Sequence, residues 1–373
     1  MHQSISKPIT VDLPERATIF ELTMTSPSEG WLVGGVFAPD FHTLQSGLIM
    51  RYHDHAWRPV DDPLSIAFLD GIAVISPDDG WVTGFSQDKS RSYLLRYVDG
   101  HWRQVAVPFQ PTGGSYFGGI RMLSADEGWI VVNPERSWRG QIRSLLLHYQ
   151  NDTWTPVTVP TPLIWDFVPV GPDDLWLVGN ASTKGPHRND STIGHYQQGQ
   201  WTATPAPGRA LLGALCMQSA TTGYATGWQP SFSRGALPPP AVVLQDDGTG
   251  WHSIQTGADP AAQEIVLLDR MDAWAFVKVH PKESDPRWPN DVIATSQHAS
   301  GTLDLSWQNV DWPFTDITHI GSMVRAAPGE YWAAAHYAVP PYADGDFRWE
   351  LLHFVDGAWH EYPPRAGGAG LRP

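Results

Sequence analysis

A small set of titratable side chains in this sequence could carry acid–base chemistry. Glu21, Asp166 and His319 each lie near the start of a short apolar segment, and Tyr337 lies where another such segment passes into a polar stretch. Side chains of these types can act as general acid or base on a glycan. They are far apart in the chain, so only the fold decides whether they meet. A hydrolase or lyase acting on carbohydrate is therefore one hypothesis, with its catalytic residues unassigned.

A second set of residues is suited to binding. Trp and Tyr rings with Arg groups hold sugars and anionic or planar ligands, and the same residue types are enriched at the centres of protein interfaces. The candidate ligand-binding residues are Arg136, Trp138, Arg139, Trp165, Trp228, Arg287, Trp288, Tyr342, Arg348 and Tyr116.

The sequence contains few other signs of reaction chemistry. It has no nucleophile elbow, no phosphate-binding glycine-rich loop and no paired zinc motif, so we expect neither a metal nor a cofactor. His53 and His55 are closely spaced, but no third ligand lies nearby. The single Cys216 lies in an apolar segment and excludes a disulfide framework.

The elements that must position these residues follow from an internal repeat. One aromatic anchor recurs at intervals of roughly 50 residues, at Trp31, Trp81, Trp129, Trp176, Tyr224, Trp274 and Trp332. A second anchor follows in every unit, at Trp57, Trp102, Trp154, Trp201, Trp251, Trp307 and Trp359. The chain is thus built of seven similar units.

Each unit contains four short segments rich in Val, Ile, Tyr and Trp and bounded by turn residues, which is typical of strands. No sustained helical spacing of apolar residues is present. Four-stranded antiparallel units at this period predict a single all-β domain over residues 1–373, a seven-bladed β-propeller with minimal helix. The blades are expected at about 18–60, 65–108, 117–159, 164–204, 210–256, 263–311 and 319–362, with 1–17 adding an outer strand to the last blade.

Within a unit, some positions are scaffold. The anchor aromatics suit packing between blades. Arg51, Arg96, His148, His195 and His353 share one repeat position, which predicts a common structural hydrogen bond. Asp-Gly pairs between strands three and four, at Asp99, Asp247 and Asp356, predict two-residue hairpin turns.

The remaining residues are unevenly distributed. The chain has 19 Trp, and six of them, Trp138, Trp165, Trp228, Trp288, Trp312 and Trp349, are not repeat anchors. They lie in or beside the connections from strand two to three and from blade to blade, which emerge at one end of an up-and-down blade. The longest of these connections hold 12 of the 24 basic residues but only 9 of the 39 acidic ones. This long-loop face is predicted to bind a ligand, although aromatic side chains that simply cover one another remain an alternative.

The repeat resembles known propeller families. Val33-Gly34-Gly35, Arg51-Tyr52 and Trp57 resemble a kelch repeat, and Asp247-Gly248-Thr249-Gly250-Trp251 resembles the end of an Asp-box. The Glu-Gly-Trp lead and the later Asp-Gly and Trp are similar to repeats of photosystem II assembly-factor-like bacterial propellers. The resemblance covers about residues 18–362 and implies the fold; an assembly-factor role is what it suggests about function.

Charge and composition narrow the partners. A net charge of −15 disfavours nucleic acid, and no apolar stretch is long enough for a membrane span or a signal peptide. We therefore expect a cytoplasmic monomer that uses its long-loop face to bind a carbohydrate-like or small anionic ligand, or a protein partner. The alternative is the carbohydrate-active enzyme, with its site at the mouth of the central channel.

Overall fold

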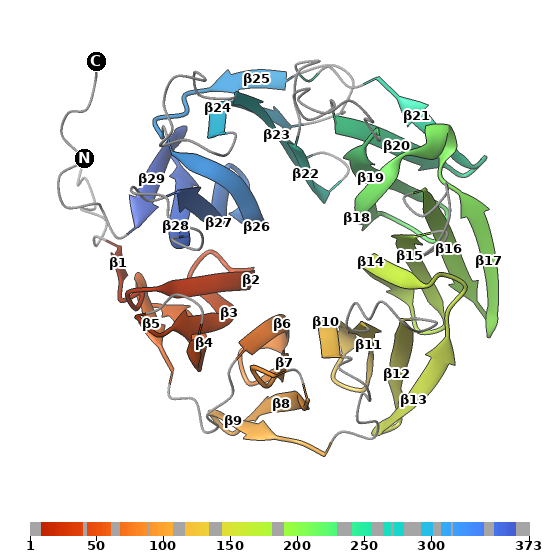
Figure 1. Cartoon of the computed structure of the whole chain (residues 1–373), viewed down its shortest axis with the longest axis horizontal. Helices are drawn as coiled ribbons and strands as arrows, with labels where there is room; N and C mark the ends of the chain where they lie inside the picture. The colour runs from red at the N-terminus through yellow and green to blue at the C-terminus, as the bar shows by residue number, and fades with distance from the viewer. Residues whose placement is uncertain are drawn as a thin grey trace, which may run out of the picture. The chain divides into compact units, whose positions relative to one another are not determined.

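The computed structural model confirms a seven-bladed β-propeller with four antiparallel strands in each blade (Figure 1). It describes residues 9–39, 43–60, 68–88, 90–106, 116–133, 144–180, 190–229, 241–255, 258, 264–269, 272–279, 292–300, 307–314, 316–338 and 347–362. These residues include no α-helix and one short 3₁₀ turn, Pro207–Arg209. We number the blades in chain order.

The chain divides into two compact units. Unit 1 consists of residues 1–87, 93–105 and 317–373 and holds three blades. Blade 1 is β2 (Ala17–Ser26), β3 (Glu29–Phe37), β4 (Leu44–His53) and β5 (Ala56–Pro59). Blade 2 is β6 (Phe68–Ser76), β7 (Asp79–Phe85), β8 (Ser92–Val98) and β9 (His101–Gln104). Blade 7 is β26 (Ile317–Ala327), β27 (Glu330–Ala338), β28 (Phe347–Val355) and β29 (Ala358–Tyr362).

Unit 2 consists of residues 88–92 and 106–316. Blade 3 is β10 (Tyr116–Ser124), β11 (Glu127–Asn133), β12 (Leu145–Gln150) and β13 (Thr153–Thr158). Blade 4 is β14 (Leu163–Gly171), β15 (Asp174–Asn180), β16 (Ser191–Gln197) and β17 (Gln200–Pro205). Blade 5 is β18 (Leu211–Met217), β19 (Thr222–Trp228), β20 (Ala241–Asp247) and β21 (Trp251–Ile254). Blade 6 is β22 (Glu264–Asp269), β23 (Asp272–Val279), β24 (Val292–Ser300) and β25 (Trp307–Val310).

The extension before blade 1 joins the first blade. Thr10–Val11 forms β1, which pairs in parallel with β5, the edge strand of that blade. Thr10 N donates to His55 O and Asp12 N to Trp57 O, each at 3.0 Å. The prediction that this segment extends the last blade is therefore wrong: the edge of β5 offers unpaired backbone groups close to where the chain enters blade 1.

Two-residue turns join strands three and four where they were expected, with one exception. Asp99 and Gly100 both have positive φ, as do Asp356 and Gly357, so each pair forms the predicted hairpin turn. In blade 5 the prediction is wrong. There Asp246 pairs with Trp251, so the turn is longer, and the Asp246 carboxylate accepts from the backbone of Gly248 at 3.0 Å and of Gly250 at 3.2 Å.

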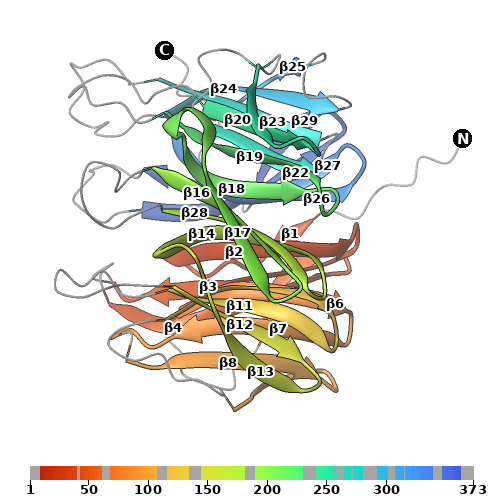
Figure 2. The same ribbon diagram turned by 90° about the vertical axis from the view of Figure 1, so that its right-hand side faces the viewer.

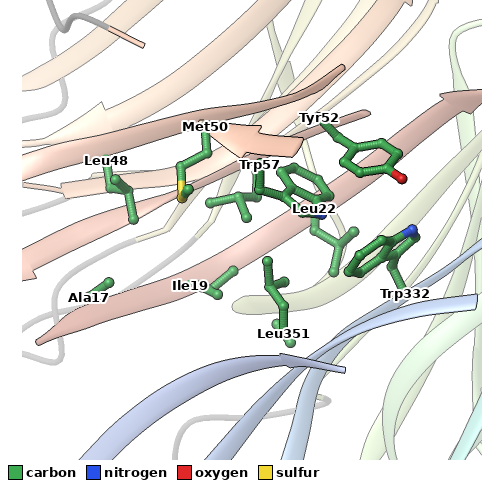
Figure 3. Close-up of a cluster of buried hydrophobic side chains, with 11 residues drawn as sticks. Ala17, Ile19, Leu22, Leu48, Met50, Tyr52, Trp57, Trp332 and Leu351 are labelled. Carbon is green, nitrogen blue, oxygen red and sulfur yellow. The ribbon is translucent and has the colours of Figure 1, made fainter. Parts of the chain in front are cut away.

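The strand-two anchor of one blade packs against the strand-three and strand-four aromatics of the next. In unit 1, the Trp31 ring lies 5.0 Å from Tyr97 and 5.5 Å from Trp102, both edge to face. Trp332 makes the corresponding contacts with Tyr52 at 5.3 Å and Trp57 at 5.6 Å (Figure 3). In unit 2, Trp129 packs against Tyr196 at 5.5 Å. These contacts confirm that the anchors hold neighbouring blades together, since edge-to-face indoles combine large apolar burial with favourable ring electrostatics.

A base and an acid accompany the anchor in six blades. The base lies in strand three, one residue before the position that Tyr52 occupies in blade 1. Its side chain lies flat on the strand-two Trp and bonds an acidic side chain two residues before that Trp. The pairs are Glu29–Arg51, Asp79–Arg96, Glu127–His148, Asp174–His195, Asp272–His298 and Glu330–His353. His195 stacks 4.0 Å from Trp176, for example, and Arg51 lies 5.0 Å from Trp31. The predicted structural hydrogen bond is confirmed, and His298 belongs to the same series.

Blade 5 departs from this pattern. Its anchor is Tyr224, which pairs with Gln245 in place of a base, and Thr222 stands in the place of the acid. At the next position Asp246 replaces the strand-three aromatic. Blade 5 therefore lacks both the charged pair and one ring of the packing between blades.

Removing one buried anchor should destabilise the fold strongly. Trp332 is fully buried and stacks on His353 at 4.1 Å besides packing against blade 1. We expect Trp332→Ala to lower the free energy of unfolding by about 3–5 kcal/mol, because a cavity replaces the indole. Urea unfolding followed by circular dichroism measures this. Trp165→Ala, at an exposed indole, is the control with an expected loss under about 1 kcal/mol. Equal losses would contradict the assignment of Trp332 as a joint between blades.

Candidate functional site

In each blade, strand one begins, strand two ends and strand three begins at the same end, which is the long-loop end. Six inner strands carry a β-bulge there, between Ile19 and Glu21, Leu69 and Gly71, Phe117 and Ile120, Ile164 and Asp166, Leu212 and Ala214, and Ile317 and His319. A bulge leaves its extra residue unpaired and redirects that side chain. The repeat thus places a redirected position at this end in six of the seven blades.

Two exposed indoles lie at the long-loop end of unit 2. Trp165 is the bulge residue of β14 and is 49% exposed, with its Nε1 donating to Asn180 Oδ1 at 2.5 Å. Trp228 ends β19 and is 46% exposed. Its ring covers the bulge of β18, where a Cβ on Gly213 would meet Trp228 Cζ3 at 3.6 Å. Strands β14 and β18 lie side by side (Figures 1 and 2), so both indoles cap neighbouring inner strands.

Two of the remaining Trp outside the repeat pack within their own unit. Trp312 is buried against Phe276 at 5.6 Å and Phe314 at 5.0 Å. Trp349 lies over Gly321, where a Cβ would come within 2.4 Å of its ring, and contacts His336 at 5.2 Å. The Trp residues outside the repeat therefore include both exposed and packed members, which their positions in the sequence did not separate.

The carboxylates proposed for catalysis link neighbouring blades. Glu21 Oε2 accepts from Ile72 N at 2.9 Å in unit 1. In unit 2, Asp166 Oδ2 accepts from Leu215 N at 2.8 Å and its Oδ1 from Phe167 N at 2.9 Å. Each carboxylate follows a bulge and reaches the inner strand of the next blade, so each has a structural role whatever else it does.

Asp70 is an acid that the sequence reading missed. It is the bulge residue of β6 and accepts from Thr83 Oγ1 at 2.9 Å. Burial, with a smaller contribution from the negative charge of Glu21, raises the pKa of Asp70 to about 8, while the Thr83 hydrogen bond opposes the shift. Its equivalence to Phe20 and Trp165 in the repeat was the available signal.

An aromatic cluster lies beside Asp70 in the chain. Phe68 packs against Phe20 at 5.4 Å, Phe37 at 6.2 Å and Phe85 at 5.0 Å, all at the long-loop end of unit 1. Phe20 is 39% exposed. This end of unit 1 thus presents apolar surface, which the distribution of Trp and Arg in the sequence did not indicate.

The blade 7 candidates also lie at the long-loop end of unit 1. His319 is exposed and Tyr337 half-buried. His336 is held by Thr318, with 3.0 Å between Thr318 Oγ1 and His336 Nδ1. Burial, together with the charge of His319, lowers the pKa of His336 to about 4, so this imidazole is neutral at pH 7. It can accept or donate a hydrogen bond but adds no positive charge.

Most of the predicted binding residues lie outside the described residues: Arg136, Trp138, Arg139, Arg287, Trp288 and Tyr342. Tyr116 and Arg348 belong to β10 and β28, and only their backbone is described. Among the described residues, no group of three or more His, Cys, Asp or Glu could hold a metal ion, and no helix is long and apolar enough to cross a membrane.

Comparison with known proteins establishes a shared fold. No family model and no curated protein matches the sequence. Among solved structures, YCF48 bound to D1 peptide is 13% identical with a TM-score of 0.59, covering 92% of this chain and 95% of that one. YCF48 from Cyanidioschyzon merolae is 13% identical with a TM-score of 0.54, over 92% and 97%. The WD40 propeller domain of Doa1 is 10% identical with a TM-score of 0.54, over 92% and 95%. At these identities the likeness extends to the fold alone.

Because the pKa of Asp70 is raised, we expect a neutral substitution at this position to stabilise the protein by an amount that depends on pH. Because the folded pKa lies above the unfolded value, the stability that neutral Asp70 contributes is fully present below about pH 4 and is lost as the pH rises toward 8. We expect Asp70→Asn, which can still accept from Thr83, to raise the free energy of unfolding by about 1–3 kcal/mol at pH 8, discounted for the side chain's partial exposure. At pH 4 the gain should vanish.

Thermal and urea unfolding between pH 4 and pH 9 measure this difference. Asp78→Asn, an exposed acid in the same blade, is the control with the same change of charge. A gain that is the same at every pH would show that Asp70 titrates normally in the folded protein.

Proposed function

We propose that this chain binds a protein partner, through a peptide segment, on the long-loop end of its blades. One observation carries the proposal: two indoles of unit 2 expose about half of their surfaces, Trp165 on inner strand β14 and Trp228 at the end of β19, over the neighbouring inner strand β18. Exposed indoles are favoured anchors for a partner, because they bury large apolar area at little cost in side-chain entropy.

The surroundings of these indoles favour a peptide over a sugar. Trp165 already bonds Asn180, whereas Trp228 Nε1 makes no hydrogen bond with another described residue. Unit 1, taken by itself, exposes the edge of a phenylalanine cluster around Phe68 at its own long-loop end. Apolar surface of this kind suits the side chains of a protein, while a sugar site needs convergent polar groups around each ring.

The fold comparison supports the same proposal. A propeller of the same architecture, YCF48, has been solved bound to a D1 peptide. The repeat also resembles that of photosystem II assembly-factor-like propellers. A carbohydrate-like or small anionic ligand, and the carbohydrate-active enzyme with Asp166, His319, Tyr337 or Glu21, are the competing hypotheses.

Peptides selected against the protein test the proposal. Sequences recovered from a random peptide library by phage display are synthesised and titrated by calorimetry. We expect a combined Trp165→Ala and Trp228→Ala variant to weaken their binding by about tenfold or more, since each is a large exposed anchor. Leu123→Ala is the matched control, because Leu123 is 41% exposed in the part of β10 near its tight turn, at the opposite end.

Unchanged affinity in the double variant would contradict the proposal. A glycan array is probed in parallel with the same variants. If glycans bind and lose affinity in the double variant while no peptide is selected, the carbohydrate hypothesis replaces this one.

A further inference from the structure

A cavity separates blades 4 and 5 within unit 2, away from the long-loop residues discussed above. It has a volume of about 320 Å³ and is lined by strands β15, β16 and β17 of blade 4 and by β20 and β21 of blade 5. Blade 4 contributes Trp176, His195 and Thr202, which lie in register across β15, β16 and β17, and blade 5 contributes Asp246 and Trp251. The volume is at the small end of the range for ligand pockets.

The cavity lies where one ring of the repeat is missing. Between blades 1 and 2, the Tyr97 ring lies 5.0 Å from Trp31 and 5.1 Å from Trp102, and its hydroxyl accepts from Arg51 Nη1 at 3.2 Å. Blades 4 and 5 keep this frame, with Trp176, Trp251 and His195 in the corresponding positions. Asp246 takes the place of the tyrosine, as its pairing with Trp251 shows.

The replacement leaves a buried carboxylate that is only half satisfied. Asp246 is 6% exposed. Its Oδ1 accepts from Gly248 N and Gly250 N, and no described residue donates to Oδ2. The described lining includes no Lys or Arg, and His195 Nε2 is already bonded to Asp174 at 2.7 Å. A carboxylate that lines a cavity without a counter-charge attracts a cation, so the cavity favours one.

The walls of the cavity suit an organic cation. Trp176 and Trp251 meet at 5.7 Å with their planes 71° apart. Indole faces attract guanidinium and alkylammonium groups, most strongly where water is excluded. The protein already uses this combination elsewhere: Arg51 lies over Trp31 at 5.0 Å and Arg96 over Trp81 at 4.8 Å, each bonded to a carboxylate.

We propose that the cavity between blades 4 and 5 binds an organic cation, a guanidinium or alkylammonium group that pairs with Asp246 Oδ2 and packs on the indoles of Trp251 and Trp176. The group belongs either to a peptide side chain or to a free small molecule. This site is independent of the proposed partner surface at the long-loop end, because it shares no residue with it.

Calorimetric titration at pH 7 and low salt tests the site with three probes. N-acetyl-argininamide represents a peptide guanidinium, choline represents a small quaternary ammonium, and p-cresol is the neutral ring of the missing tyrosine. We expect at least one cation to bind with a Kd below about 10 mM, and Asp246→Asn to weaken it by about tenfold, since Asn keeps the acceptor for Gly248 and Gly250 but not the charge.

Asp247→Asn is the matched control. Asp247 is the next residue of β20, exposed and absent from the cavity, so its neutralisation should leave the affinity within about twofold. Tighter binding of argininamide indicates a peptide source, and tighter binding of choline indicates a small molecule.

Three results would overturn the proposal. They are no binding of either cation up to about 10 mM, equal losses in the Asp246 and Asp247 variants, and p-cresol binding more tightly than both cations. If Asp246→Asn does not fold, cation binding is measured in Thr202→Phe instead. The Phe side chain would fill the cavity from edge strand β17 while Asp246 stays intact. Loss of cation binding in Thr202→Phe supports the site, and unchanged binding refutes it.

Discussion

The packing of one indole against the aromatic pair of the next blade is the interaction on which this structure depends. A four-stranded sheet of this size cannot bury enough apolar surface alone, so each blade must share its core with a neighbour. Trp31 and Trp332 show the arrangement most completely, since each meets both a tyrosine and a tryptophan of the following blade. The loops that join the strands are free to vary because this joint does not involve them.

The same joint determines where charges can be used. In six blades an acid holds a base flat on the indole, and these pairs account for many of the titratable groups that might otherwise be taken for a catalytic site. Blade 5 has lost the pair and also a ring of the joint. Asp246 then faces a cavity, and a departure from a structural repeat becomes a candidate binding site.

Much of the fold was predictable because the repeat aromatics report packing directly. The anchors predicted seven blades, and Arg51 and His148 predicted a shared hydrogen bond whose acids, such as Glu29, were not identified. The partner of β1 was not predictable, since any free strand edge can satisfy the backbone hydrogen bonds of an extended segment. Asp70 was missed because its pKa depends on burial and on Glu21. Trp165 and Trp312 could not be separated, because exposure depends on neighbours that their spacing does not reveal.

A double-mutant cycle between Trp31 and Tyr97 tests the central claim most directly. The free energy of unfolding is measured for Trp31→Leu, Tyr97→Leu and the double variant in urea. If the indole and the ring of the next blade form the joint, the two losses should be non-additive, with a coupling of about 0.5–1.5 kcal/mol. Fully additive losses would mean that each ring is buried independently and that the blades are held together by something else.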